Sequence, residues 1–537
     1  MFKRRVNRII VVVAFLSLAV TAIQGGTLPL PSPAATSSIT AASLKRHLSF
    51  LASDELGGRY TLSPSNRIAA RYLASQLEYY GFRGAAPHGA FFQKVPLVFQ
   101  QVNLGVSKLV LTQGDSRREF KYGDDFGQQL PLTFSANGGL VFAGYGVSSP
   151  EHGYDDYAKV DTKGKIVVEL FGLPQALRRV KLPAEEKEEA AAKAHGAVAV
   201  IVITPKNYLS AWANIKNVML LSDQPSLPPR PGQSAGSHPI FAGAELIKAL
   251  ASAIGVDAGF LEATGGKPVE PKTLQATAQI SVQVDTKDAA PAQNVVGILD
   301  GSDPVLKDQY VMFSAHYDHL KTSDSGQIYN GADDDGSGTA SVLEIAKACA
   351  MERPKRSILI VFHTGEELGL FGSEYNTDYS PVVPLKDIVA DFNIDMIGRS
   401  RPAGDDDVRD AHLTDERSIY IIGADKLSSE LNKISEQTDE VTARMRFDYT
   451  YNNDNDPERF YYRSDHYNYA KHGIPIIFYF TGVHRDYHEP SDKVDKIDFP
   501  KMERIARMVF ATGWRVANLD HRLAVDKKPE PDDDGAN

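Results

Sequence analysis

The segment from His316 to Asp395 decides the fold, and it contains four short polar motifs. They read Ala315-His316-Tyr317-Asp318, Gly331-Ala332-Asp333-Asp334-Asp335-Gly336-Ser337-Gly338, Gly365-Glu366-Glu367-Leu368-Gly369 and Asn393-Ile394-Asp395-Met396. Apolar runs at 310–313, 358–362 and 388–390 are typical of buried strands, and helical segments alternate with them. This predicts an α/β fold with a mixed, mostly parallel sheet flanked by helices. Ligands bind beyond the carboxyl ends of such strands, so one histidine and several carboxylates should gather there as a metal site.

The length and composition of the chain limit the other possibilities. A chain of 537 residues suggests two or three domains, and 42% hydrophobic residues suffice for packed cores. With 58 Lys and Arg against 68 Asp and Glu, the net charge of -10 argues against nucleic-acid binding. The single cysteine, Cys349, shares a helical face with apolar residues, which favours a core position over a nucleophilic role.

The N-terminus predicts export. The basic start Met1-Phe2-Lys3-Arg4-Arg5 precedes an apolar run that ends in small residues near Ala22, as in a secretory signal over residues 1–22. The run is short for a membrane span, although an uncleaved anchor is the alternative. We therefore expect a secreted or periplasmic protein with no other stable membrane association.

Composition divides the rest of the chain. Residues 23–43 are predicted to be a linker, and residues 44–100 and 286–520 to be the two parts of one main domain. Residues 101–285 are rich in strand-like runs, show no cluster of metal ligands and are predicted to be an inserted domain. The charged, Pro-rich end, 521–537, is predicted to be disordered.

The central motifs supply the ligands that zinc prefers. Zinc binds His nitrogen and carboxylate oxygen, and two zinc ions need one shared carboxylate to clamp a reacting water. The candidates are His316, Asp333, Glu367, Asp395 and a later histidine, with Glu366 beside them. Asp318 lies two residues after His316 and suits a carboxylate that orients a ligating imidazole. Singly, an Asp run fits a turn or a helix start equally well, but together and in this order the motifs are specific.

The later histidine has several candidates, which are His412, His466, His472, His484 and His488. His484 and His488 both follow the apolar run 474–480 and could reach the edge of the sheet. Pro490 should fix the turn after His488, and a rigid turn suits a metal ligand. We favour His488, with His484 as the alternative.

The motifs together resemble metallopeptidase family twenty-eight, the co-catalytic zinc aminopeptidases. Leu51-Ala52-Ser53-Asp54-Glu55-Leu56-Gly57-Gly58-Arg59, Asn294-Val295-Val296-Gly297, the four central motifs and Tyr487-His488-Glu489-Pro490-Ser491-Asp492 are similar to that family. In the insertion, Phe142-Ala143-Gly144-Tyr145-Gly146 and Tyr154-Asp155-Asp156-Tyr157 resemble the β-rich protease-associated domain.

The resemblance implies a role for each candidate and two Zn2+ per chain. His316 and Asp395 would hold one zinc, Glu367 and His488 the other, Asp333 would bridge them, and Glu366 would be the general base. The implied protein is an exported aminopeptidase acting on peptide substrates. Separately from the resemblance, Tyr479 and Ser464-Asp465-His466 are candidates for lining the pocket, with a core position as the alternative for Tyr479. The alternatives are a carboxypeptidase or glutaminyl cyclase on the same fold, or a non-catalytic binding module.

Overall fold

The computed structural model describes residues 29–529, apart from residues 130, 181, 221–223, 231–238 and 264. The predicted signal over residues 1–22 therefore lies outside the described residues. In the described part of the chain, no helix has both the length and the apolar character needed to cross a bilayer.

The main domain is built on a nine-stranded mixed sheet in the order β1-β16-β18-β17-β19-β22-β20-β21, with β2 also beside β16. The strands are β1 (Arg83–Gly84), β2 (Phe92–Val95), β16 (Ala292–Leu299), β17 (Tyr310–His316), β18 (Ser357–His363), β19 (Ile388–Ile394), β20 (Ser418–Ile422), β21 (Arg446–Asp448) and β22 (Ile476–Phe480). The central strands β18, β17, β19 and β22 are parallel, and β16 and β20 run antiparallel to their central neighbours. The predicted fold class is confirmed.

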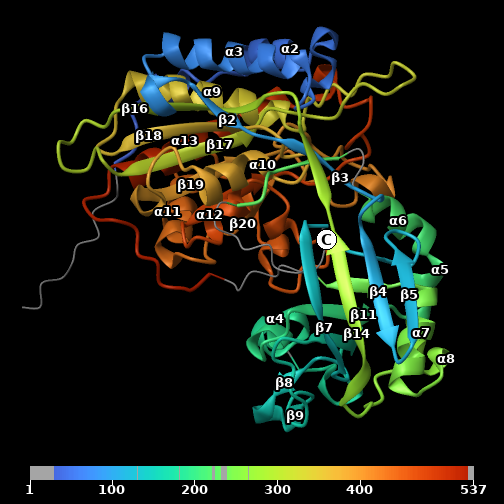
Figure 1. The fold of residues 1–537 in the computed structure, drawn as a ribbon. Coiled ribbons are helices and arrows are strands. Elements are labelled where there is room, and N and C mark those ends of the chain that lie inside the picture. Colours follow the sequence, from blue (N-terminus) through green and yellow to red (C-terminus); the bar gives the residue numbers. More distant parts are fainter. Residues whose placement is uncertain are drawn as a thin grey trace, which may run out of the picture.

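Helices cover both faces of this sheet because its strands are apolar on both sides. In β18, Ile360 and Phe362 belong to the core under one helical layer, whereas Leu359 and Val361 belong to the core on the other face. One layer contains α1 (Pro33–Ser37), α2 (Ala41–Leu51), α3 (Pro64–Tyr79), α9 (Gly336–Met351), α11 (Ser429–Asp439) and α13 (Phe499–Ala517). The short helices α10 (Phe371–Glu374) and α12 (His466–Ala470), which contact each other, lie on the other side (Figure 1).

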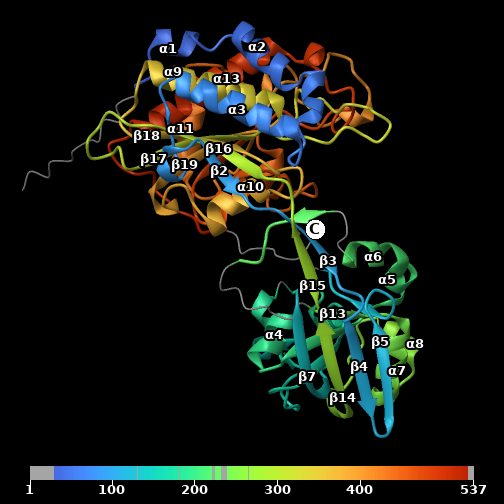
Figure 2. The same ribbon diagram turned by 45° about the horizontal axis from the view of Figure 1, so that its top comes forward.

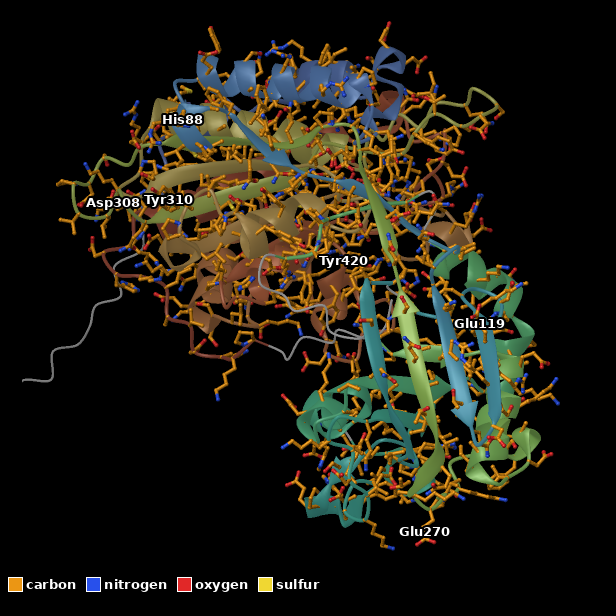
Figure 3. All side chains as sticks on the ribbon, in the orientation of Figure 1. His88, Glu119, Glu270, Asp308, Tyr310 and Tyr420 are labelled. Carbon is orange, nitrogen blue, oxygen red and sulfur yellow. The ribbon has the colours of Figure 1, made fainter. Side chains whose placement is uncertain are left out.

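Residues between β3 and β15 form a second body with its own eight-stranded sheet (Figure 1). Its strands, in spatial order, are β5 (Ser116–Lys121), β4 (Lys108–Gln113), β14 (Lys272–Val282), β7 (Phe134–Phe142), β10 (Ile166–Leu170), β11 (Ala199–Ile203), β13 (Ile240–Ala242) and β6 (Phe126–Gly127). Helices α4 (Glu188–Ala194), α5 (Lys206–Ser210), α6 (Trp212–Met219), α7 (Ala244–Ile254) and α8 (Ala258–Glu262) accompany it. Glu119 and Glu270 mark this body in Figure 3, and His88 and Tyr310 mark the main domain.

Two antiparallel strands connect the bodies. β3 (Val98–Val102) pairs with β15 (Val284–Asp288), and β12 (Pro225–Ser226) adds a third strand beside β3. The chain therefore leaves the main domain and returns to it along one ladder (Figure 2).

Two segments are more ordered than their composition predicts. In the predicted linker, α1 forms and the apolar side chains of Ala35 and Ile39 enter the main core. In the predicted disordered tail, Leu523 is buried and His521 lies 2.7 Å from Glu430, so residues 521–529 pack along the main domain. A few apolar side chains within polar stretches supply the burial that composition alone does not reveal.

Candidate metal centre

The four predicted motifs converge at the carboxyl edge of the central strands. His316 is the last residue of β17, Glu366 and Glu367 follow β18, and Asp395 follows β19. His488 comes from the loop after β22. Because these strands are parallel neighbours, their carboxyl ends place the side chains at one edge.

The central carboxylate is Asp334, and not Asp333 as predicted. Asp334 Oδ1 lies 3.2 Å from His316 Nε2, and Asp334 Oδ2 lies 3.1 Å from His488 Nε2. Asp333 instead accepts a hydrogen bond from Gly398 N at 2.6 Å, and its other oxygen lies 3.2 Å from His484 Nε2.

The three consecutive aspartates have different roles because the turn points them in different directions. The backbone amides of Asp333 and Asp334 both donate to Asp492 Oδ2, at 2.9 and 3.2 Å, which holds the turn. Asp335 is the N-cap of α9, and its Oδ1 accepts from Gly338 N at 2.8 Å. The residue types alone do not reveal which carboxylate faces the histidines.

The ligand candidates form two groups that share Asp334. In the first group, His316 Nε2 lies 3.6 Å from Asp395 Oδ1 and 3.8 Å from Glu366 Oε2. In the second group, His488 Nε2 lies 3.0 Å from Glu367 Oε2. The residues that the sequence analysis paired, His316 with Asp395 and Glu367 with His488, lie in the same groups here, and their binding of metal stays a prediction.

The sequence interpretation missed His319, which belongs to the second group. Its Nδ1 lies 2.6 Å from Glu367 Oε1 and 3.7 Å from Asp334 Oδ2. The available signal is a second histidine three residues after His316, just beyond the end of β17. His484, the alternative to His488, faces Asp333 and does not enter either group.

Asp318 is buried beside the first group. The ring nitrogen His316 Nδ1 lies 3.1 Å from the main-chain oxygen of Asp318 and 3.8 Å from its carboxylate. The carboxylate itself accepts from Glu366 N at 3.3 Å and from Thr61 Oγ1 at 2.8 Å. The main chain of Asp318 thus orients the imidazole, and its side chain holds the loop that carries Glu366.

Two consecutive side-chain hydrogen bonds hold Asp395 in place. Ser464 Oγ donates to Asp395 Oδ2 at 2.8 Å, and Asn393 Nδ2 donates to Ser464 Oγ at 3.0 Å. Ser464 therefore positions the carboxylate of Asp395, a candidate metal ligand. The next two residues, Asp465 and His466, are also buried. Tyr479 lies in the apolar core and does not line the site.

The electrostatics of the groups favour bound cations. Burial alone would raise the pKa of Asp334, yet the imidazoles of His319, His316 and His488 hold it well below its usual value. Burial would lower the pKa of His488, but Asp334 and Glu367 raise it to about 10. For Glu366, burial raises the pKa well above the ordinary value, and the neighbouring carboxylate of Glu367 adds to this effect. The imidazoles thus compensate Asp334, whereas the protein compensates a negative charge on Glu366 only incompletely.

Several buried donor atoms in these groups satisfy the chemistry of a metal site. Among the described residues, His316 Nε2, His319 Nδ1 and Glu367 Oε1 are buried and have no hydrogen-bond partner, although buried polar atoms are normally paired. Their nitrogen and carboxylate donors are those that zinc prefers. The residues therefore fit metal ions at both groups. The inserted body also brings Glu151, His152 and Glu186 together, but Glu151 and His152 are exposed there.

Arg59 joins the N-terminal segment to the loops of the site. Its buried guanidinium donates to the carbonyl oxygens of Tyr317, Leu51, Asn330 and Gly331 at 2.6–3.0 Å. A side chain at the preceding Gly58 would place Cβ 2.1 Å from the main-chain oxygen of Leu320. Only glycine therefore lets the backbone at residue 58 pack this closely against the loop that contains Leu320. The motif around Arg59 thus positions the loop that follows His316 and the turn that precedes Asp334.

Replacing Arg59 by methionine should destabilise the main domain by at least about 3 kcal/mol, because four buried carbonyl groups lose their donor. The unfolding transition of the main domain under denaturant measures this change. Arg83→Met is the matched control, since Arg83 and Asp300 form an ion pair with side chains 55% exposed and should contribute no more than about 1 kcal/mol. Equal effects for both variants would contradict the assigned role of Arg59.

The comparisons with known proteins agree with the motifs. Residues 294–513 match the sequence profile of peptidase family M28, which confirms the resemblance to that family. Aminopeptidase YwaD of Bacillus subtilis (strain 168) is 24% identical over 265 residues, which cover 48% of this chain and 52% of the relative. A probable leucine aminopeptidase of Arthroderma otae is 27% identical over 224 residues, covering 40% of this chain and 56% of the relative. The chain thus spans about half the length of these curated relatives.

One solved structure with extensive overlap is the aminopeptidase from Aneurinibacillus sp. strain AM-1, with 19% identity and a TM-score of 0.44. The similarity covers 92% of this chain and 99% of that structure. BSAP, a zinc aminopeptidase from Bacillus subtilis, is 20% identical with a TM-score of 0.43, over 92% of this chain and 98% of that one.

Proposed function

Because residues 294–513 belong to peptidase family M28, we propose that this protein is an exported dizinc aminopeptidase that removes N-terminal residues from peptides. The observation that carries the proposal is Asp334, whose two oxygens face His316 and His488 in two separate ligand groups. A shared carboxylate between two histidines is what a pair of metal ions requires. His316, Asp334 and Asp395 would hold one ion, and Asp334, Glu367 and His488 the other.

The bound ions would lower the pKa of water toward about 7 and polarise the scissile carbonyl. Glu366 takes the proton from the attacking water at a carboxylate oxygen and later delivers it to the leaving amine. This carboxyl is partly exposed and lies 3.8 Å from His316 Nε2, so it reaches the first group.

The alternatives differ in the end of the peptide that they recognise and in the reaction. A carboxypeptidase, a glutaminyl cyclase and a non-catalytic binding module remain the rival proposals. The named relatives favour the aminopeptidase, since two of them carry that description.

A screen of matched peptides with metal analysis tests the proposed function. The protein, carrying about two zinc ions, should release the first residue of peptides with a free N-terminus and spare the same peptides after N-acetylation. Cleavage from the carboxyl end, cyclisation of N-terminal glutamine, or no turnover by the metal-loaded protein would each replace the proposal by the corresponding alternative.

The inserted body is proposed to be a protease-associated domain that limits access of substrates to the site. It contacts the main domain just after the loop that carries Glu366 and Glu367. Arg230 lies 3.0 Å from both Glu374 and Asp378, and Tyr379 donates a hydrogen bond to the oxygen of Pro228. These contacts hold the insert against the helical segment that follows Glu367.

Excising the insert should leave zinc binding intact and change the preference for peptide length. Val102 faces Val284 in the ladder of β3 and β15, so an Asn-Gly turn can replace residues 103–283 and close the hairpin. We expect two zinc ions per chain and a several-fold change in the ratio of kcat/KM for a long peptide to that for a dipeptide. Loss of zinc from a folded deletion variant would show that a metal ligand lies in the insert.

A further inference from the structure

We propose that residues 224–230 of the inserted body, here called the strap, position Glu366 by holding the helical segment 371–379 that follows it. The strap contains β12 and ends at Arg230. This role rests on the proposed function, in which Glu366 is the general base, and extends it. The insert would then act on turnover as well as on the access of substrates.

Arg230 anchors the end of the strap on two carboxylates of the helical segment. Its Nη2 lies 3.0 Å from Glu374 Oε1 and 3.0 Å from Asp378 Oδ2. The side chain of Asp378 is buried, and Lys471 Nζ and His472 Nε2 lie 2.7 and 2.6 Å from it. These two cations belong to the main domain and hold Asp378 in place. Arg230 therefore joins the strap to a fixed point.

Apolar contacts join the middle of the strap to the same helical segment. Leu227 is buried in a small cluster that contains residues of both bodies. The cluster consists of Val95, Leu97, Leu227 and Ala292, with Phe371, Tyr375 and Tyr379 among the side chains packed against it. In addition, Tyr379 Oη donates to the main-chain oxygen of Pro228 at 2.8 Å. The strap thus contacts both ends of the helical segment.

The start of the helical segment packs directly on the loop that carries Glu366. Leu370 N donates to the main-chain oxygen of Glu366 at 3.0 Å. A Cβ atom at Gly372 would lie 2.3 Å from the main-chain oxygen of Thr364, so the two backbones are in close contact there. A shift of the helical segment should therefore move residues 364–366 with it.

Loosening this loop should displace Glu366 more than its neighbour Glu367. The carboxylate of Glu367 has two close imidazole contacts, 2.6 Å from His319 Nδ1 and 3.0 Å from His488 Nε2. The carboxylate of Glu366 lies 3.8 Å from His316 Nε2, which is beyond hydrogen-bond distance. The direction of Glu366 therefore depends more on its main chain, and loss of the strap contacts should reduce turnover without releasing metal.

The competing role of the strap is to limit the access of substrates and nothing more. In that case, loss of its contacts should change KM for long peptides and leave kcat for a small substrate unchanged. A positioning role predicts a lower kcat even for a small substrate, with little change in KM. Because a misplacement of about 1 Å can cost about 10²-fold in rate, a partial shift of Glu366 should cost roughly tenfold.

Steady-state kinetics of the zinc-loaded full chain on an amino-acid p-nitroanilide test the proposal. The double variant Leu227→Ala/Arg230→Met should lower kcat roughly tenfold, with unchanged zinc content and little change in KM. Arg230→Lys, which can still pair with a carboxylate, should retain most of the wild-type kcat. The matched control is Lys108→Met, which removes an exposed ion pair with Glu119 elsewhere in the insert and should behave as the wild type.

Amide hydrogen exchange gives a readout that does not depend on activity. Exchange over residues 364–379 should be faster in the double variant than in the wild type and unchanged in Lys108→Met. Unchanged kcat or unchanged exchange in the double variant, or a loss of zinc that accounts for its lost turnover, would overturn the role of the strap while the proposed function stands. Failure of the zinc-loaded wild type to release any N-terminal residue would instead overturn the proposed function.

Discussion

Glu366→Gln is expected to lower kcat by about 10²–10⁴-fold while the protein retains both metal ions. Glutamine has the same size but cannot take a proton from water. The main chain at this residue is held independently, because Glu366 N donates to Asp318 Oδ1 at 3.3 Å. Steady-state kinetics on protein of measured zinc content give the result.

The neighbouring Glu367 supplies the matched control. Its carboxylate lies 3.0 Å from His488 Nε2 and belongs to the second group. Glu367→Gln should therefore lose zinc as well as activity, whereas Glu366→Gln should lose activity alone. Near-normal turnover in fully metallated Glu366→Gln would reject Glu366 as the general base.

Asp334→Asn should lose at least one zinc ion and at least about 10²-fold in activity, because it removes the carboxylate that faces both histidines. Asp333→Asn should retain both ions, since its side chain faces Gly398 and His484. Zinc content and kcat/KM of the two purified variants provide the measurement. The reverse pattern would restore the original prediction, in which Asp333 is the shared ligand.

The apolar runs of the sequence were sufficient to predict the central sheet and its functional edge. Strand periodicity and the parallel order place His316, Glu367 and Asp395 at neighbouring strand ends, and this needs no knowledge of side-chain direction. Asp333 and Asp334 could not be distinguished in this way, because the amides held by Asp492 set the direction of each side chain. The contact of Asp492 with these amides joins residues far apart in the chain, so local sequence patterns do not reveal it.

The place of His319 beside Glu367 could not be predicted for a similar reason. It lies beyond the end of β17, where no periodic pattern relates a residue to the sheet edge. Its position depends on Gly331, a residue on another part of the loop. The packing of residues 29–43 and 521–529 also depends on surfaces that distant segments create, so composition predicted less order than the structure has.

The pairing of β2 with β16 has a consequence for biosynthesis. Val95 pairs with Ala292, so about 200 residues separate the two halves of this contact, and a ribosome adding about 5–20 residues per second needs about 10–40 s to synthesise them. During this interval α2, α3 and Arg59 have emerged without the strands and carbonyl groups that bury them. The inserted body, whose sheet lies between these halves, can complete its own core first. The main domain must then assemble around an already folded insert. Until then, the N-terminal helices α2 and α3 of the main domain are the segment that needs protection.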